Sequence, residues 1–166
     1  MFDSSDKIEK MSNNAITKAI GILQSKVSNP SEGLPDEIFY YISKTTPLLN
    51  VDLLIKHENE QTLLSWRNDQ YTGSGWHVPG GIVRFKETME DRIKKVAETE
   101  IGTSVDFDPT PIAINQIIQE FLPSLRFVYK ILKSDMSEIL FEMGHEAQLL
   151  TVFGPPISVV LLWFVG

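Results

Sequence analysis

The sequence predicts an α+β fold, in which a mixed sheet carries one central helix on a face. Three observations support this prediction. Apolar and β-branched runs typical of strands come both before and after a segment with helical spacing. That segment holds Met89, Ile93, Ala97 and Ile101, which lie four residues apart. A Pro-Gly-Gly turn at Pro79 joins a strand to this helix, so strand, glycine loop and helix form one unit.

The composition limits the class of protein. A chain of 166 residues with 42% hydrophobic residues is typical of one folded domain. A net charge of −7 disfavours nucleic acid as the main partner, and the lack of cysteine excludes disulfides and thiolate metal sites. The first residues lack a signal peptide's apolar segment, and the apolar run 157–165 is shorter than the roughly 20 residues of a membrane span. We therefore expect a cytoplasmic protein that binds neither nucleic acid nor membrane.

The N-terminal part predicts two helices. Residues 4–27 have apolar residues at helical spacing, and the Pro- and Gly-containing segment 28–33 ends them. We expect an amphipathic helix that docks on the domain or on a second copy of it. This divides the chain into a helical extension, 1–33, and a domain, 34–166. A shorter helix opens at Pro35, with two acidic residues in its first turn, and ends before Pro47.

Strands are predicted on both sides of the central helix. Residues 48–55 are almost continuously apolar, which is typical of a strand buried on both faces. Asp52 interrupts this run, and its carboxylate needs partners, either structural hydrogen bonds or a site. A second strand, 62–67, ends at Arg67. After the helix, a loop (106–111) leads to strands at 112–121 and 125–133, and 137–143 is a further short strand or helical turn.

The spacing around the glycines resembles a known motif. Gly81 is followed after five residues by Glu87, and after seven more by the sequence KVAETEIG, residues 95–102. This resembles the Nudix box, the loop and helix that hold a metal-bound diphosphate in Nudix hydrolases. The resemblance implies the Nudix fold, an α/β/α sandwich with a mixed sheet. In place of the arginine and two of the glutamates of the box, this chain has Lys95, Val96 and Thr99.

The missing glutamates limit the metal chemistry of the helix. At about 100° per residue, positions 96, 99 and 100 share a helix face, where three carboxylates could hold two or three Mg²⁺ ions. Glu100 is the carboxylate that remains there. We therefore expect at most a one-metal site and no general base from the box.

Within the family, residues 34–146 are most similar to the GDP-mannose mannosyl hydrolases. The similarity rests on Thr46-Pro47-Leu48 before the buried Asp52, on a box that lacks the same two glutamates, and on the segment Gly144-His145-Glu146. In those enzymes water attacks the sugar carbon, and GDP leaves with the metal on its diphosphate. The resemblance implies a nucleotide-sugar hydrolase that depends on Mg²⁺, with Mn²⁺ as an alternative. We expect a homodimer.

The resemblance also implies roles for single residues. Gly80 would offer its carbonyl and Glu100 its carboxylate to the cation. Arg67 would face the leaving diphosphate, and Asp52 the nucleotide or a network of arginines. His145 would be the general base, because an imidazole with an ordinary pKa of about 6.5 suits that role.

Three further residues fall at or near family positions with changed chemistry. Lys95 keeps the charge of the box arginine without its bidentate fork, and we count it with the catalytic residues. Arg84 would share a strand face with an arginine position that here is Ile82. Phe127 replaces a tyrosine of the substrate site. We interpret His57 and His77 as loop and sheet-surface residues, and the aromatic residues Trp66, Trp76 and Phe85 as core.

Two alternatives to the leading function stay open. In the first, a Nudix pyrophosphohydrolase attacks phosphorus of another nucleoside diphosphate derivative, with a base outside the box. In the second, the chain is a non-catalytic Nudix-fold nucleotide-binding module. The reason to consider it is that two glutamates of the box are missing.

Overall fold

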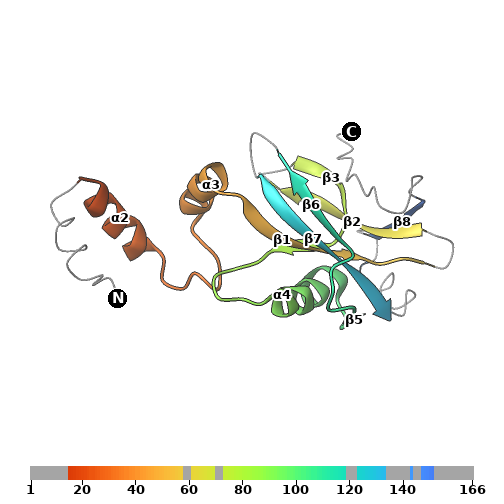
Figure 1. The fold of residues 1–166 in the computed structure, drawn as a ribbon. Helices are drawn as coiled ribbons and strands as arrows, with labels where there is room; N and C mark the ends of the chain where they lie inside the picture. Colours follow the sequence, from red (N-terminus) through yellow and green to blue (C-terminus); the bar gives the residue numbers. More distant parts are fainter. Residues whose placement is uncertain are drawn as a thin grey trace.

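The computed structural model describes residues 15–57, 61–69, 73–118, 123–133, 143 and 147–151. In these ranges the chain forms a larger mixed sheet, a smaller antiparallel sheet and the helices α2, α3 and α4 (Figure 1). The predicted α+β class is confirmed. The apolar run 157–165 and most of the element expected at 137–143 lie outside the described residues. None of the described helices is long and apolar enough to cross a bilayer.

The larger sheet is built around the parallel pair β1 (Leu48–Leu54) and β7 (Ser124–Lys133). Its order is β4-β1-β7-β5, and β6 also pairs with β7. The outer strands are antiparallel to their neighbours, and their bounds are β4 Gly80–Ile82, β5 Asp106–Phe107 and β6 Ala113–Ile117. A parallel pair needs a long crossover connection, and the crossover here contains the central helix.

The smaller sheet has the order β3-β2-β8, with bounds β3 Gly73–His77, β2 Gln61–Asp69 and β8 Ala147–Thr151. It continues from the larger sheet, because the amide of Leu63 donates a hydrogen bond of 3.0 Å to the carbonyl of Ile55 just after β1. The sequence predicted β2 and β3 with shifted ends. It did not predict β8, nor β5, which lies within the expected loop 106–111.

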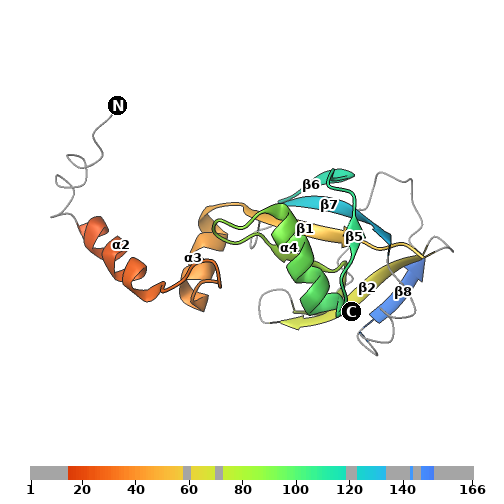
Figure 2. The same cartoon turned by 90° about the horizontal axis from the view of Figure 1, so that it is seen from below.

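The central helix α4 (Met89–Val96) continues into a π-helical turn, η1 (Ala97–Ile101). The helix ends at Gly102, whose φ of 85° is the left-handed conformation that glycine tolerates. The predicted apolar stripe is confirmed, since Ile93, Ala97 and Ile101 are almost completely buried. They pack in one core cluster with β1 residues, and Figure 2 shows α4 along that face of the sheet.

The glycines after Pro79 lie in a strand, not in the loop that the sequence predicted. Neither Gly80 nor Gly81 is among the described glycines with positive φ. A methyl group on Gly80 would lie 2.7 Å from the carbonyl oxygen of Val51, and one on Gly81 would lie 2.9 Å from Cγ2 of Val96. Glycine is therefore required here because β1 and α4 approach closely, and not because of a turn.

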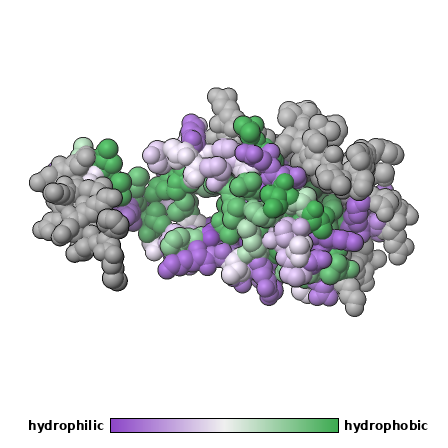
Figure 3. All heavy atoms as spheres, in the orientation of Figure 1, coloured by the Kyte–Doolittle hydropathy of each residue, from purple (hydrophilic) through white to green (hydrophobic). Residues whose placement is uncertain are grey.

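The N-terminal helices differ in how they contact the domain. α3 (Asp36–Thr45) begins after Pro35 as predicted and buries Ile38. α2 (Ala15–Lys26) has no buried residue and stands away from both sheets (Figures 1 and 2). Its exposed apolar side chains contribute to the green surface in Figure 3, and the largest are Ile16, Ile20, Ile22 and Leu23. The expected docking of this helix on its own domain is not observed.

Candidate functional site

Glu100 lies at the centre of a polar cluster at the end of η1. Nη2 of Arg67 lies 3.3 Å from one carboxylate oxygen, Oε1. The other oxygen, Oε2, lies 3.3 Å from Nε2 of His77 and accepts a hydrogen bond of 3.3 Å from the amide of Gly80. The side chain of Glu100 is 24% exposed, so solvent or a ligand can still reach it. The structure thus brings together three residues that the sequence predicted and one, His77, that it did not.

The hairpin of β2 and β3 positions the two basic side chains of the cluster. Ser65 pairs with His77, and Arg67 pairs with Gly75. Residues two apart on a strand point to the same face, so Arg67 and His77 share one face of the hairpin. Trp66 and Trp76 pair on the other face, with ring centroids 5.2 Å apart. Trp66 is 42% exposed, so the prediction that it belongs to the core is wrong.

The β1–β4 ladder orients the backbone of Gly80. The carbonyl of Pro79 accepts from the amide of Leu53, and the amide of Val83 donates to the carbonyl of Leu49. Hydrogen-bonded and non-bonded positions alternate in an antiparallel pair, so the amide and carbonyl of Gly80 point away from β1. The amide reaches Glu100 in this way. The carbonyl points to the same side of the strand as the amide, where it can bind a ligand.

The π-helical turn sets the direction of Glu100. The amide of Gly102 donates to the carbonyl of Ala97, a bond over five residues. Regular helical geometry predicted one shared face for positions 96, 99 and 100, and in the structure these positions differ in their burial. Val96 is buried in the core, whereas the hydroxyl of Thr99 donates to the carbonyl of Lys95 on the exposed side. Of these three positions, Glu100 is the one whose side chain contacts Arg67, His77 and Gly80.

A buried ion pair lies next to the cluster. Asp52 is 1% exposed and accepts a 2.6 Å hydrogen bond from Nε of Arg126, and Nη2 of the same guanidinium contacts the second carboxylate oxygen. Asp52 is also the partner of Gly80 across the β1–β4 ladder. The sequence identified Asp52 but missed Arg126. A signal was present, because a buried carboxylate needs a cation and Arg126 alternates with apolar residues in the predicted strand 125–133.

No protein-family model matches this chain. The solved structure of a MutT NUDIX hydrolase from Burkholderia pseudomallei superposes with a TM-score of 0.53, at 17% sequence identity. The match covers 69% of this chain and 92% of that one. The chain has the Nudix fold. Shewanella oneidensis NrtR also superposes, with a TM-score of 0.50 and 17% identity, over 61% of this chain and 51% of its own.

A relative in sequence is the low-salt glycan biosynthesis protein Agl8 of Haloferax volcanii. It is 28% identical over 137 residues, which are 80% of this chain and 87% of that protein. The similarity therefore extends over most of both chains.

Three other predicted site residues, Lys95, Arg84 and Phe127, have contacts of their own outside the cluster around Glu100. The ammonium of Lys95 pairs with Glu98 at 2.7 Å, and both side chains are more than half exposed. The guanidinium of Arg84 donates to the carbonyl of Glu32. Phe127 packs against the core cluster. His145 and its neighbours lie outside the described residues.

Glu87 lies just before the N-cap of α4 and has two hydrogen-bond partners there. Its Oε2 accepts hydrogen bonds of 2.8 Å from the amide of Arg84 and from Nε of Arg92. Both Glu87 and Arg92 are mostly buried. The pair fixes the loop between β4 and α4.

The donors around Glu100 fit one divalent cation better than several. Among the described residues, no three acidic, histidine or cysteine side chains could together hold a metal ion. One carboxylate and one carbonyl can bind a cation such as Mg²⁺, which keeps several waters and takes further oxygens from a phosphate. Arg67 and His77 would then have to share the carboxylate with the cation.

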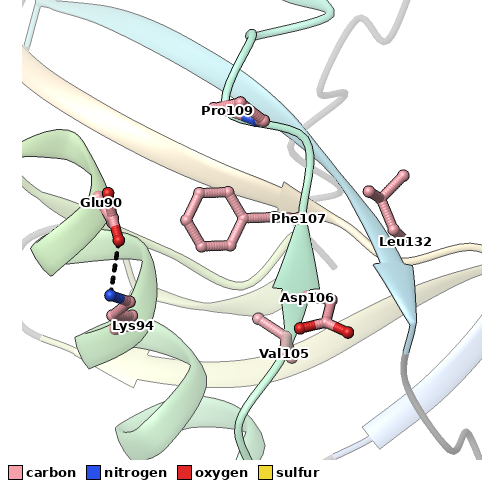
Figure 4. A pocket seen from close by; sticks show the side chains of 7 residues that line it. All are labelled: Glu90, Lys94, Val105, Asp106, Phe107, Pro109 and Leu132. Atoms are coloured by element: carbon pink, nitrogen blue, oxygen red, sulfur yellow. Dashed lines mark hydrogen bonds and ion pairs between the residues drawn. The ribbon is translucent and has the colours of Figure 1, made fainter.

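A surface hollow of about 700 Å³ lies elsewhere, between α4 and β5 (Figure 4). Its walls include Phe107 and the ion pair of Glu90 with Lys94, whose atoms are 2.6 Å apart. The hydrogen bond that the Lys94 ammonium donates to Glu90 raises the pKa of Lys94. None of the predicted site residues that the structure describes lines this hollow.

Proposed function

We propose that the chain is a hydrolase of a nucleotide sugar similar to GDP-mannose, dependent on Mg²⁺. In this reaction water attacks the sugar carbon, and a nucleoside diphosphate leaves. The observation that carries the proposal is the cluster itself, in which Glu100 lies 3.3 Å from the amide of Gly80 and 3.3 Å from Nη2 of Arg67. A carboxylate for a cation and a guanidinium for a phosphate thus lie side by side.

The protein's residues would divide the work as follows. Glu100 and the carbonyl of Gly80 would hold the cation, which when bound supplies positive charge to the leaving diphosphate. The side chain of Arg67 is 34% exposed, so it can donate to a phosphate oxygen from its present position. The buried pair of Asp52 and Arg126 supports the strand that carries Gly80. His145 is the proposed general base; we leave Lys95, Arg84 and Phe127 out of the mechanism.

The relative named for glycan biosynthesis supports a sugar-containing substrate. Glycans are built from activated sugars, and a nucleoside diphosphate is a common activating group. A nucleotide sugar would place its diphosphate at Arg67 and the cation, and its sugar beyond them.

Hydrolysis in ¹⁸O-labelled water tests the position of attack. The proposal expects the label in the released sugar and none in the nucleotide, as read by mass spectrometry. Label in a phosphate group would reject attack at carbon and would favour the pyrophosphohydrolase alternative.

Two single variants test the residues. Glu100→Gln and His145→Gln should each lower kcat by at least about 100-fold, because each removes a charge or a base that acts in the transition state. Glu98→Gln is a matched control on the same turn, since Glu98 pairs with Lys95 at the surface. Full activity in both test variants would reject either form of hydrolysis.

One observation favours a second candidate, a nucleotide-binding module without turnover. Both carboxylate oxygens of Glu100 already have partners, Arg67 and His77. A cation would have to compete with these groups. Micromolar binding of a nucleotide sugar, with no product after long incubation with Mg²⁺ or Mn²⁺, would establish this candidate and reject the hydrolase.

We also propose that residues 1–33 form an extension that joins two copies in a cytoplasmic homodimer. The support is α2, whose Ile16 and Ile20 are 65% and 43% exposed on one side of a helix. Light scattering of the full chain and of a chain that begins at residue 27 tests the dimer. A monomeric full chain would reject it.

A further inference from the structure

The side chain of His77 is more buried than we expected for a residue on the surface of the sheet, and it contacts Glu100. Its side chain is 13% exposed, and Nε2 lies 3.3 Å from Oε2 of Glu100. Its other nitrogen, Nδ1, is buried and has no hydrogen-bond partner in the part of the chain that the structure describes. The prediction of a sheet-surface residue is therefore wrong. A mostly buried imidazole beside the proposed cation ligand needs a reason of its own.

The distance between the two side chains suits two ligands of one ion. Two atoms that bind the same cation at about 2.1 Å lie roughly 3.0 Å apart at right angles and about 3.4 Å apart at a tetrahedral angle. The observed separation of Nε2 and Oε2, 3.3 Å, falls between these values. A cation could therefore bind both atoms without a movement of the backbone. Gly80, whose amide is 3.3 Å from the same oxygen, lies within reach as well.

The helix supplies only one metal ligand, so a second side-chain ligand has to come from another element. Position 96 is a buried valine and position 99 is a threonine that bonds to its own helix, so neither gives a ligand. His77 comes from β3, and its pairing with Ser65 of β2 fixes its backbone. The hairpin thus supplies a histidine next to Glu100, and the helix supplies no second carboxylate.

We propose that His77 is a ligand of the cation that Glu100 and Gly80 bind. This rests on the proposed function, because it concerns the same cation. A nitrogen donor changes the preference of the site, since imidazole binds transition-metal ions well, whereas Mg²⁺ prefers oxygen. The site then favours Mn²⁺ and Co²⁺ over Mg²⁺.

Pulsed electron paramagnetic resonance of the Mn²⁺-loaded protein tests this without any assay of activity. A coordinated imidazole gives a ¹⁴N coupling to the manganese. The chain has three histidines, His57, His77 and His145, so the double variant His57→Gln/His145→Gln leaves His77 alone. We expect the coupling in the full chain and in this double variant, and its loss in His77→Gln. The double variant keeps the test valid even if His77→Gln does not fold.

Titrations of the metal ions complete the test. His77→Gln should raise the Kd for Mn²⁺ and Co²⁺ by about tenfold or more, and the Kd for Mg²⁺ by less than about threefold, because one ligand in a small set is lost. His57→Gln is the matched control and should change neither.

The outcomes separate this inference from the proposed function. If the Mn²⁺-loaded chain shows no ¹⁴N coupling while Glu100→Gln still weakens binding, His77 is not a ligand, and the cation of the proposed function stands. In that case His77 only holds Glu100 in place. If the full chain binds neither Mn²⁺ nor Mg²⁺ at millimolar concentration, the inference and the cation-dependent function both fail.

Discussion

Gly80 lies where β1 leaves no room for a side chain. A methyl group there would lie 2.7 Å from the carbonyl of Val51, so β1 would have to move. Gly80→Ala should lower the free energy of unfolding by about 1–3 kcal/mol, the usual cost of overpacking. Gly21→Ala is the control, because nothing lies within 4 Å of its added methyl group and alanine suits a helix. Urea unfolding of both variants measures the difference, and equal stability would contradict it.

The pair of Asp52 and Arg126 makes a second prediction at the scale of residues. Asp52 is 1% exposed, so loss of its partner leaves a buried and uncompensated charge. Arg126→Met should cost roughly 3–5 kcal/mol of stability. Addition of Asp52→Asn should recover part of this loss, because it removes the charge.

A double-mutant cycle from urea unfolding measures this coupling. The control is Arg84→Met, which removes an exposed guanidinium that donates to the carbonyl of Glu32. It should lower the free energy of unfolding by less than about 1 kcal/mol. A double variant less stable than Arg126→Met alone would show that the two residues act independently.

Among the elements, α4 depends on its N-terminal cap. Thr88 and Asp91 form a capping box, in which the Thr88 hydroxyl accepts a 3.1 Å hydrogen bond from the amide of Asp91. Thr88→Ala should lower stability by about 1 kcal/mol at neutral pH. Thr99→Ala is the control, since the Thr99 hydroxyl bonds back to its own helix and adds little.

The same cap predicts that the stabilisation it gives to α4 depends on pH. The hydrogen bond from the Thr88 hydroxyl lowers the pKa of Asp91 below its ordinary value. The stabilisation is therefore present above the unfolded-state pKa of about 3.9 and is lost as the pH falls through the lowered value. The difference between wild type and Thr88→Ala, measured by unfolding at pH 7 and pH 2, should shrink in acid. A constant difference would show that Asp91 takes no part in the cap.

The elements also show where prediction from the sequence stops. The four-residue spacing from Met89 to Ile101 predicted α4 and its buried face, because helical periodicity is local. The π turn at Ala97–Ile101 was not predicted, since a regular helix was assumed. The short strands β4 and β5 have two or three residues each, and only their partners define them.

At the scale of the whole molecule, α2 is separate from the two sheets. At a protein concentration at which the full chain is monomeric, deletion of residues 1–26 should shift the midpoint of thermal unfolding by less than about 2 °C, because no described residue of α2 is buried within its own chain. Ile38→Ala in α3 is the contrast. Ile38 is 8% exposed, and its truncation should cost about 2 kcal/mol or more. Calorimetry of both proteins at that concentration makes the comparison, and a large loss of stability from the deletion would mean that α2 contacts its own domain in solution.

The sequence by itself determined the order of strand, glycines and helix and the buried stripe of α4, because these follow from local spacing. The cost of a charge in an apolar run identified Asp52 as a residue that needs a partner, and the resemblance to Nudix hydrolases identified Gly80, Glu100 and Arg67 as predicted site residues. Only the tertiary structure decided that His77 faces Glu100 and that Arg126 neutralises Asp52. These contacts join β3 to η1 and β1 to β7, and the pairing of distant strands depends on the packing of the entire domain. A local pattern can offer Arg126 as a candidate cation for Asp52, but it cannot determine which residues of distant strands meet.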